Sequence, residues 1–247
     1  MISCDLNCDM GEGIGNDAAL MPFITSANIA CGYHAGDEST MRSTIMMAKN
    51  AGVVVGAHPS FFDRENFGRT EIKDIRPQQV YELVSAQIKI LHKIADDCNT
   101  HLHHVKPHGA LYNMAARDAA LSMAIAHAVY DFDKTLILFG LSGSYLISEA
   151  KTMGLKTASE VFADRTYQDD GSLTPRSKSN ALIEDEEQSI SQVIQMVKKG
   201  TVTSTSGKEV PIVEETICLH GDGKRAAAFA NAINKKLKAD NITIKAI

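Results

Sequence analysis

The stretch His104-Val-Lys-Pro-His-Gly-Ala-Leu-Tyr-Asn113 begins as a predicted strand and breaks at Pro107 and Gly109 before a helix. Because strand side chains alternate between faces, His104, Lys106 and His108 point the same way. A packing strand has no use for a cation and two imidazoles on one face, whereas a catalytic cavity does. A surface turn with solvated side chains explains this stretch alone equally well. The same layout recurs along the chain, and this recurrence favours a functional site.

Seven apolar runs alternate with segments of helical spacing. The predicted strands are Ser3–Cys8, Ala27–Cys31, Val53–Ala57, Leu102–Val105, Leu136–Phe139, Thr157–Phe162 and Thr216–Leu219. The predicted helices are Ser39–Asn50, Pro77–Asp97, Ala115–Tyr130, Gly143–Met153, Glu186–Lys199 and Lys224–Ala239. Strict alternation indicates parallel strands joined by helices, in a closed barrel or an open sheet. No Gly-x-Gly-x-x-Gly follows the first strand and polar groups end most strands, so we predict an α/β fold, a seven-stranded, TIM-like (β/α) barrel.

The length of 247 residues suits one barrel domain over residues 1–247, because a single α/β barrel has roughly 250 residues. Two insertions interrupt the alternation. Residues 163–182 form a polar loop, and loops of this length in compact domains are usually functional or disordered. Residues 201–212 are expected to form a β-hairpin, because β-forming residues flank the turn sequence Ser206-Gly207-Lys208.

Charge and hydropathy exclude several classes of protein. The net charge is −5 and the basic residues are scattered, so the chain has no basic stripe for nucleic acid. The N-terminal segment lacks the pattern of a secretory signal, and no window reaches the ~18 apolar residues of a membrane span. The five cysteines, with Cys4 and Cys8 too far apart on one strand to pair, indicate buried thiols in a reducing compartment. We therefore expect a cytoplasmic protein.

Polar side chains gather at the carboxyl ends of the predicted strands and in the loops that follow. On the first strand Asp5, Asn7 and Asp9 share one face, and the apolar residues share the other. Asp37, after the second strand, suits a helix N-cap equally well. The other candidates are His34, His58, Lys106, His108, Glu160, Asp164, Arg165, Arg176, His220 and Asp222. Because active sites of TIM-type barrels lie at this end, we expect these groups to surround one cavity.

These motifs resemble those of the LamB/YcsF family. The resemblance rests on six stretches in the same order, 5–13, 28–37, 56–60, 104–113, 160–167 and 219–222, and covers essentially the whole chain. It implies a barrel of the glycoside hydrolase/deacetylase type, related to polysaccharide deacetylases. It also implies a 5-oxoprolinase activity, the opening of 5-oxo-L-proline (pyroglutamate) to L-glutamate with hydrolysis of ATP to ADP and phosphate. The partners that the resemblance implies are 5-oxoprolinase subunits B and C.

The chemistry of opening a lactam suggests a role for each candidate. Coupling to ATP makes sense if the lactam oxygen is phosphorylated, because the ring carbon then becomes a better electrophile. Lys106, Arg165 and Arg176 are candidates for holding anionic groups. We favour His108 as the base for the attacking water, because the adjacent Lys106 would keep its imidazole neutral. The full set of catalytic candidates is Asp5, Asp9, His58, Lys106, His108 and Glu160. The substrate-binding candidates are Asn7, His34, Asp37, Asp164, Arg165, Arg176, His220 and Asp222.

The nucleotide site, the metal and the reaction class stay open at this point. No Walker A sequence is present, so we expect a partner subunit to provide most of the contacts that bind ATP. Asp9, His34 and His58 suit a divalent metal, although no tight His-x3-His spacing is present. One alternative is a metal-dependent amide or ester hydrolase of the deacetylase type that acts without ATP. Another is a non-catalytic barrel that binds pyroglutamate.

Overall fold

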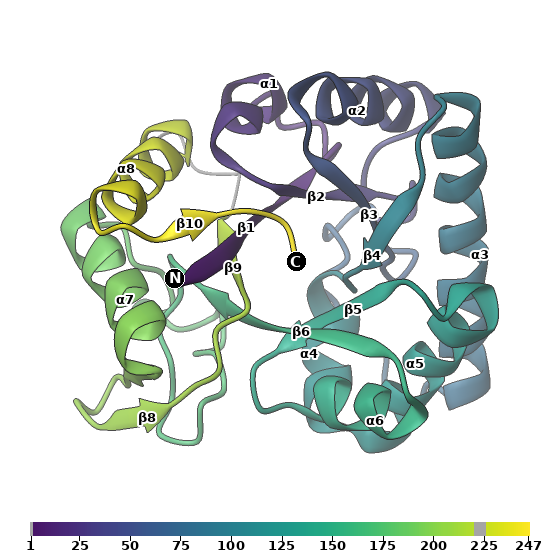
Figure 1. Cartoon of the computed structure of the whole chain (residues 1–247). Helices are drawn as coiled ribbons and strands as arrows, with labels where there is room; N and C mark the ends of the chain where they lie inside the picture. Colours follow the sequence, from purple (N-terminus) through teal and green to yellow (C-terminus); the bar gives the residue numbers. More distant parts are fainter. Residues whose placement is uncertain (1, 220–225) are drawn as a thin grey trace.

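The computed structural model describes residues 2–219 and 226–247, and its centre is a closed ring of parallel strands (Figure 1). The ring consists of β1 Ser3–Met10, β2 Ser26–Ala30, β3 Val54–His58, β4 Leu102–Val105, β5 Ile137–Leu141, β6 Lys156–Phe162 and β9 Thr216–Leu219. Each strand pairs with the next, and β9 pairs with both β6 and β1, which closes the barrel. The predicted seven-stranded TIM-like barrel is therefore confirmed. A short strand, β10 Thr243–Ile244, pairs with the first residues of β1.

Helices surround the ring on its outer side (Figure 1). They are α1 Asp17–Leu20, the 3-10 turn η1 Met21–Phe23, α2 Glu38–Ala51, α3 Pro77–Asp97, α4 Gly109–Arg117, α5 Ala119–Asp133, α6 Tyr145–Met153, α7 Glu186–Lys199 and α8 Ala226–Ala239. The prediction of one helix over Ala115–Tyr130 is wrong. The chain breaks at Asp118, whose backbone is extended and whose carboxylate accepts hydrogen bonds from the backbone N–H of Ala120 and Leu121. Asp118 is therefore an N-cap that separates α4 from α5.

Both predicted insertions have a defined structure. Strands β7 Thr201–Thr203 and β8 Glu209–Pro211 pair antiparallel and form the expected hairpin. The segment 163–182 is an irregular loop with two isolated bridges, Arg165 to Leu182 and Tyr167 to Leu173. The buried guanidinium of Arg165 donates to the carbonyl oxygens of Thr174 and Ala181. These hydrogen bonds tie distant parts of the loop to each other.

The two faces of β1 determine what fills the barrel. Its outward residues Cys4, Leu6, Cys8 and Met10 are buried in the hydrophobic core beneath the helices. Its inward residues are the polar Asp5, Asn7 and Asp9, whereas TIM barrels usually fill this space with Val, Ile and Leu. All five cysteines are free and buried, as the sequence predicted.

Gly56 on β3 makes room for an imidazole inside the barrel. A Cβ at this position would lie 2.1 Å from Nε2 of His104. His104 therefore fills the interior, where it stacks on Phe139 with ring centroids 4.2 Å apart and donates to Oδ1 of Asn28 over 2.7 Å. The sequence placed His104 on the same face as Lys106 and His108, but it does not line the cavity described below.

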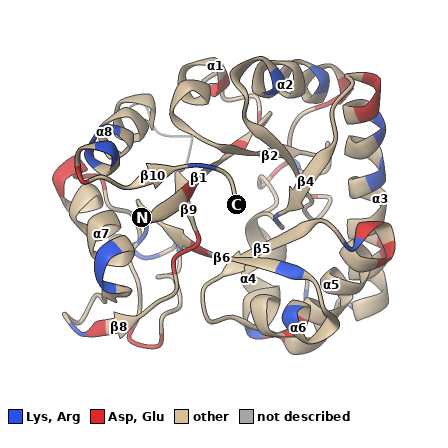
Figure 2. Cartoon of the chain, viewed as in Figure 1, with Lys and Arg blue, Asp and Glu red and all other residues tan. Residues whose placement is uncertain are grey.

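Acidic and basic residues are interspersed over the outer helices α2, α3 and α7 (Figure 2). Helix α7 begins with Glu186 and Glu187 and ends with Lys198 and Lys199, which complements its dipole. Among the helices of the described ranges, none has the length and hydropathy needed to cross a bilayer.

Candidate functional site

A cavity of about 910 Å³ lies at the carboxyl ends of the barrel strands. Its walls come from the segments after β1, β3, β4 and β5 and from the loop 163–182. Six of the residues that the sequence singled out line it, namely Asp9, His58, Lys106, His108, Arg165 and Arg176. Candidate residues from distant parts of the sequence therefore meet in one hollow.

Lys106 is the centre of a buried cluster of charges. Its Nζ lies 2.9 Å from Oδ1 of Asp9, 2.8 Å from Oε1 of Glu160 and 3.2 Å from Sγ of Cys218. Burial alone disfavours the ammonium, but the carboxylates of Asp9 and Glu160 and the thiol of Cys218 outweigh it and raise the pKa of Lys106 well above its usual range. Lys106 is therefore a fixed positive charge at the cavity wall.

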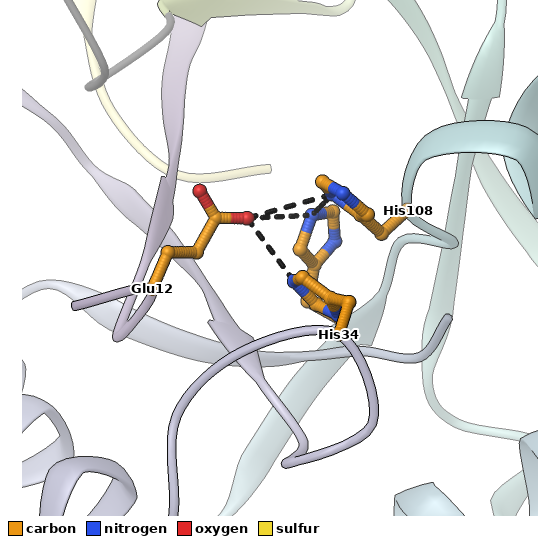
Figure 3. A group of neighbouring side chains, drawn as sticks. Glu12, His34 and His108 are labelled. Atoms are coloured by element: carbon orange, nitrogen blue, oxygen red, sulfur yellow. Dashed lines mark hydrogen bonds and ion pairs between the residues drawn. The ribbon is translucent and has the colours of Figure 1, made fainter. Parts of the chain in front are cut away.

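Four side chains converge beside this charge cluster. Oε1 of Glu12 lies 3.2 Å from Nε2 of His34, 3.9 Å from Nε2 of His58 and 3.5 Å from Nδ1 of His108. Figure 3 shows Glu12 reaching from the turn after β1 towards His34 and His108. The four ligand-type atoms all lie within 4.8 Å of one another. We call these four residues the imidazole cluster.

Backbone carbonyls fix the tautomers of two of these imidazoles. Nδ1 of His58 donates to the carbonyl oxygen of Lys106 over 2.7 Å, and Nε2 of His108 donates to that of Phe67 over 2.9 Å. The remaining ring nitrogens, Nε2 of His58 and Nδ1 of His108, then face each other with their lone pairs across 2.9 Å. Two acceptors at this distance repel unless a cation lies beside them.

The donor set suits a divalent transition metal. Three imidazole nitrogens and one carboxylate oxygen are ligands that Zn²⁺ and similar ions accept, and tetrahedral bonds of ~2.0–2.1 Å would separate the ligand atoms by about 3.3 Å. Second-shell carbonyls that orient the histidines are typical of metal sites. Nδ1 of His34 is buried with no hydrogen bond to another described residue. The imidazole cluster therefore fits a bound metal.

Burial favours the neutral form of His34 and His108, the form that metal binding requires. Burial and the neighbouring His58 lower the pKa of His34 to about 3. The pKa of His108 is also lowered, chiefly by burial and then by His58 and His34. The expectation that His108 is neutral agrees with this, but the reason given for it, the adjacent Lys106, is wrong. Lys106 points instead to the carboxylates of Asp9 and Glu160.

Phe67 supports the imidazole cluster from the loop after β3. Its backbone has φ = 58°, an unusual value for a bulky residue, and its carbonyl accepts the His108 hydrogen bond. Its ring lies edge-on to the rings of His34 and His108, with centroids 5.5 Å away in both cases. Strained backbone that orients a reactive side chain is common at functional sites.

Asp5 does not reach the cavity. It is fully buried deeper in the barrel, and its carboxylate accepts hydrogen bonds from the hydroxyls of Thr25, Ser26 and Thr216. The expectation that Asp5 and Asp9 surround the same cavity is therefore wrong. The two carboxylates are on the same strand face, but four residues of strand separate them by roughly 13 Å.

The other candidates occupy varied positions. Asn7 bridges Nζ of Lys106 and the hydroxyl of Thr216 inside the barrel. Glu160 and His34 are buried behind the cavity wall. Asp37 is the N-cap of α2, bonded to the backbone N–H of Thr40, so the alternative role is the one observed. Asp164 is partly buried and its carbonyl accepts from the backbone N–H of Ile183, and His220 and Asp222 lie outside the described residues.

Three residues of this site were not among those predicted from the sequence. Glu12 lies between Gly11 and Gly13, both with positive φ, in the turn directly after β1. A carboxylate in a glycine-rich turn at a strand end was the signal that would have indicated it. Phe67 and Ser144 also line the cavity, but Phe67 belongs to a loop and Ser144 is the N-cap of α6, so strand alternation gives no orientation for either.

The chain is similar to known proteins over its whole length. The model of the LamB/YcsF family matches residues 4–247. A protein of Shouchella clausii, named as the A subunit of 5-oxoprolinase, is 54% identical over 100% of this chain and 99% of that protein. A lactam utilization protein from Thermus thermophilus has a crystal structure that superimposes with a TM-score of 0.92 and 38% identity, covering 100% of both chains.

A more distant likeness concerns the fold alone. A family 4 carbohydrate esterase from Streptomyces lividans has a TM-score of 0.55 and 12% identity, covering 99% of this chain and 92% of that one. The whole-length match to the family model and the identity of more than half to a relative are decisive. The chain belongs to the LamB/YcsF family.

Proposed function

We propose that this chain opens the ring of 5-oxo-L-proline to give L-glutamate, as one component of an ATP-dependent 5-oxoprolinase. Support comes from its full-length similarity to a protein named as the A subunit of that enzyme. The observation that carries the chemistry is the pairing of Asp9 and Lys106, Oδ1 to Nζ 2.9 Å, beside the imidazole cluster in one cavity. This arrangement combines a proton acceptor with a fixed positive charge, as attack of water on an activated amide requires.

The reaction divides between the subunits. The sequence contains no Walker A motif, so partner subunits B and C would bind ATP and transfer its terminal phosphoryl group to the lactam oxygen. In this chain's cavity, a water oxygen then adds to the ring carbon and loses a proton. The C–N bond breaks as the ring nitrogen takes up a proton. The acyl phosphate that remains is hydrolysed by a second water to glutamate and phosphate.

Asp9 fits the role of general base better than His108. Nε2 of His108 already donates to the carbonyl of Phe67, and its Nδ1 faces Glu12 and His58. The carboxylate of Asp9 lines the cavity with Oδ2 3.3 Å from Nε2 of His58 and Oδ1 held by Lys106. Lys106 would stabilise the negative charge that develops on the reacting oxygen. A divalent cation held by Glu12, His34, His58 and His108 would supply Lewis-acid polarisation of a substrate oxygen.

The test is reconstitution with subunits B and C, 5-oxo-L-proline and ATP, with release of glutamate as the readout. Asp9→Asn is expected to lower turnover by about a hundredfold or more, the usual contribution of a general base. His92→Ala, a change at a half-exposed histidine on α3, is the matched control and should retain turnover. Normal turnover by Asp9→Asn would contradict the assignment. No glutamate from the unaltered chain with both partners would contradict the activity itself.

Lys106→Ala would be a poorer probe of the mechanism than Asp9→Asn. Lys106 is buried between two carboxylates, so its removal leaves Asp9 and Glu160 uncompensated. Breaking a buried ion pair in this way costs about 3–5 kcal/mol, and the expected loss of turnover would be mixed with unfolding. Asp9→Asn keeps the shape of the side chain and removes one charge of the cluster.

The imidazole cluster also supports a second candidate, a metal-dependent amide or ester hydrolase that acts without ATP. Such an enzyme would use the same four ligands and the Asp9 carboxylate. Incubation of the purified chain with Zn²⁺ or Co²⁺ and acetylated sugars, without ATP, separates the two. Release of acetate that is lost in His58→Ala would favour this candidate over the 5-oxoprolinase.

A further inference from the structure

Ser144, at the N-terminus of α6, has an unusual environment. It is the N-cap of a helix of 9 residues, yet its side chain makes no capping hydrogen bond. Its hydroxyl is buried, with 8% of the residue exposed, and Oγ has no hydrogen-bond partner among the described residues. An N-cap serine normally stabilises its helix by about 1 kcal/mol through that bond. Ser144 gives up this stabilisation and leaves a buried hydroxyl unpaired.

The loop that carries Ser144 forms part of the cavity wall. Leu141, Ser142, Gly143 and Ser144 all line the cavity that also contains His108 and Asp9. The loop is a tight turn, with the backbone N–H of Ser144 bonded to the carbonyl of Leu141 over 3.0 Å and Gly143 at φ = 77°. It follows β5, which pairs with β4, the strand that leads to Lys106 and His108. The turn is therefore one strand away from the reactive groups.

The electrostatics of this wall favour an anion. The first N–H groups of a helix have no acceptor within the helix, and its dipole places a partial positive charge there. Arg165, Arg176 and Lys178 of the loop 163–182 line the same cavity. Burial and the neighbouring Arg176 guanidinium lower the pKa of Arg165 to about 10, so these two cations repel each other. An anion bound in the cavity would relieve that repulsion.

We propose that the turn at the N-terminus of α6 is a carboxylate subsite, in which the Ser144 hydroxyl and the first backbone N–H groups of α6 bind the carboxylate of the small cyclic amide. The identity of this ligand as a lactam acid rests on the proposed function, whereas the anion subsite does not. The subsite anchors the end of the substrate that does not react. It leaves the amide group to Asp9, Lys106 and the imidazole cluster. This explains why an N-cap serine is buried without its usual bond.

The experiment measures binding of three probes, 5-oxo-L-proline, 2-pyrrolidinone and acetate, by titration while amide shifts of residues 143–146 are followed by NMR. The lactam 2-pyrrolidinone has the same ring without the carboxylate. Ser144→Ala is expected to weaken 5-oxo-L-proline about tenfold, the loss typical of a hydrogen bond to a charged group, and to leave 2-pyrrolidinone unchanged. The control is Ser148→Ala on the same helix, whose exposed hydroxyl bonds only within α6 in the described structure, to Tyr145 and Glu149.

Each other outcome is decisive. Equal binding of 5-oxo-L-proline by Ser144→Ala and the unaltered chain would overturn the subsite, as would an equal loss of both lactams. Acetate that binds in a Ser144-dependent way while neither lactam binds would keep the subsite and remove the lactam assignment. No shift of residues 143–146 with any of the anions would overturn the subsite. Ser144→Ala should melt at the same temperature as the unaltered chain or at a higher one, because the substitution removes no cap hydrogen bond.

Discussion

The interior of the barrel contains two polar layers built on the same face of β1. In the lower layer, Asp5 is fully buried and three hydroxyls donate to its carboxylate. In the upper layer, Asp9 faces a cavity beside Lys106 and two imidazole nitrogens whose lone pairs oppose each other across 2.9 Å. The two aspartates have the same chemistry and the same orientation on the strand. The lower layer is saturated with partners, whereas the lone pairs of the upper one still attract a cation.

The difference lies in the neighbours that each carboxylate meets. Hydroxyl donors turn Asp5 into part of the framework, although burial raises its pKa despite those bonds. Asp9 meets an ammonium and a histidine, groups that hold or move charge. A buried carboxylate therefore has a structural role when hydrogen-bond donors satisfy it. It indicates a functional site when the groups around it still favour the binding of a further charge.

The largest effect expected from this comparison is on catalysis. Asp9→Asn and Asp5→Asn remove the same charge from the two layers. Turnover per folded molecule should fall by about a hundredfold or more in Asp9→Asn and stay within a fewfold in Asp5→Asn. Reconstituted glutamate release, normalised by circular dichroism of the folded fraction, measures both. Equal losses of turnover would mean that the two layers do not differ in the way described.

The next effect concerns stability. Asp5→Ala leaves the hydroxyls of Thr25, Ser26 and Thr216 without their acceptor in a fully buried layer. We expect a loss of about 2–4 kcal/mol in the free energy of unfolding, measured by urea denaturation. Asp9→Asn should cost less, because Asp9 is partly exposed to the cavity. A larger loss in the free energy of unfolding for Asp9→Asn than for Asp5→Ala would contradict the proposed difference between the two layers.

A divalent metal should stabilise the upper layer. Zn²⁺ or Co²⁺ at about a hundred times its dissociation constant is expected to add ~2.7 kcal/mol to the free energy of unfolding, and a chelator should reverse this. Thermal melting with and without metal measures the effect. Glu12→Gln and His58→Ala should abolish it, while His92→Ala on α3 should not. An unchanged melting temperature in the unaltered chain would contradict the metal site.

The smallest effect is a pH dependence near the lower layer. Burial, then the charges of Asp5 and Glu215, raise the pKa of Glu214 from 4.5 to about 7. A raised folded-state pKa means that this group's contribution is full below about pH 4.5 and is lost as pH rises through about 7. Glu214→Gln should therefore leave stability at pH 4 nearly unchanged and raise it at pH 8, by on the order of 1 kcal/mol. Melting curves at both values measure this, and a gain confined to pH 4 would be the wrong sign.

Most of the fold follows from local patterns in the sequence. The seven strands were predicted within a few residues because apolar runs, helix caps and turns recur with regular spacing. The break between α4 and α5 was not, because the alanine-rich pattern continues across it and only the capping role of Asp118 marks it. Tertiary packing decides whether such a pattern forms one helix or two.

The site was harder to predict because alternation gives the face of a residue and not its depth. Asp5 and Asp9 have the same parity, so the sequence did not separate them. Glu12 and Phe67 lie in a turn and a loop, where neither period applies, and Ser144 lies at the start of a predicted helix, where the pattern does not show what its hydroxyl faces. Their roles depend on partners far away in the chain, such as the hydrogen bond from His108 to Phe67.

The polar interior of β1 has a consequence for folding. A shift of this strand by one residue against β2 or β9 would turn Leu6 and Cys8 inward and press Asp5 and Asn7 against the apolar helices. The bonds from Lys106 to Asn7, from Asn7 to Thr216 and from Thr216 to Asp5 would all be lost together. The polar residues inside the barrel thus fix the register of β1. They destabilise a barrel that closes with β1 shifted, even when no ligand is bound.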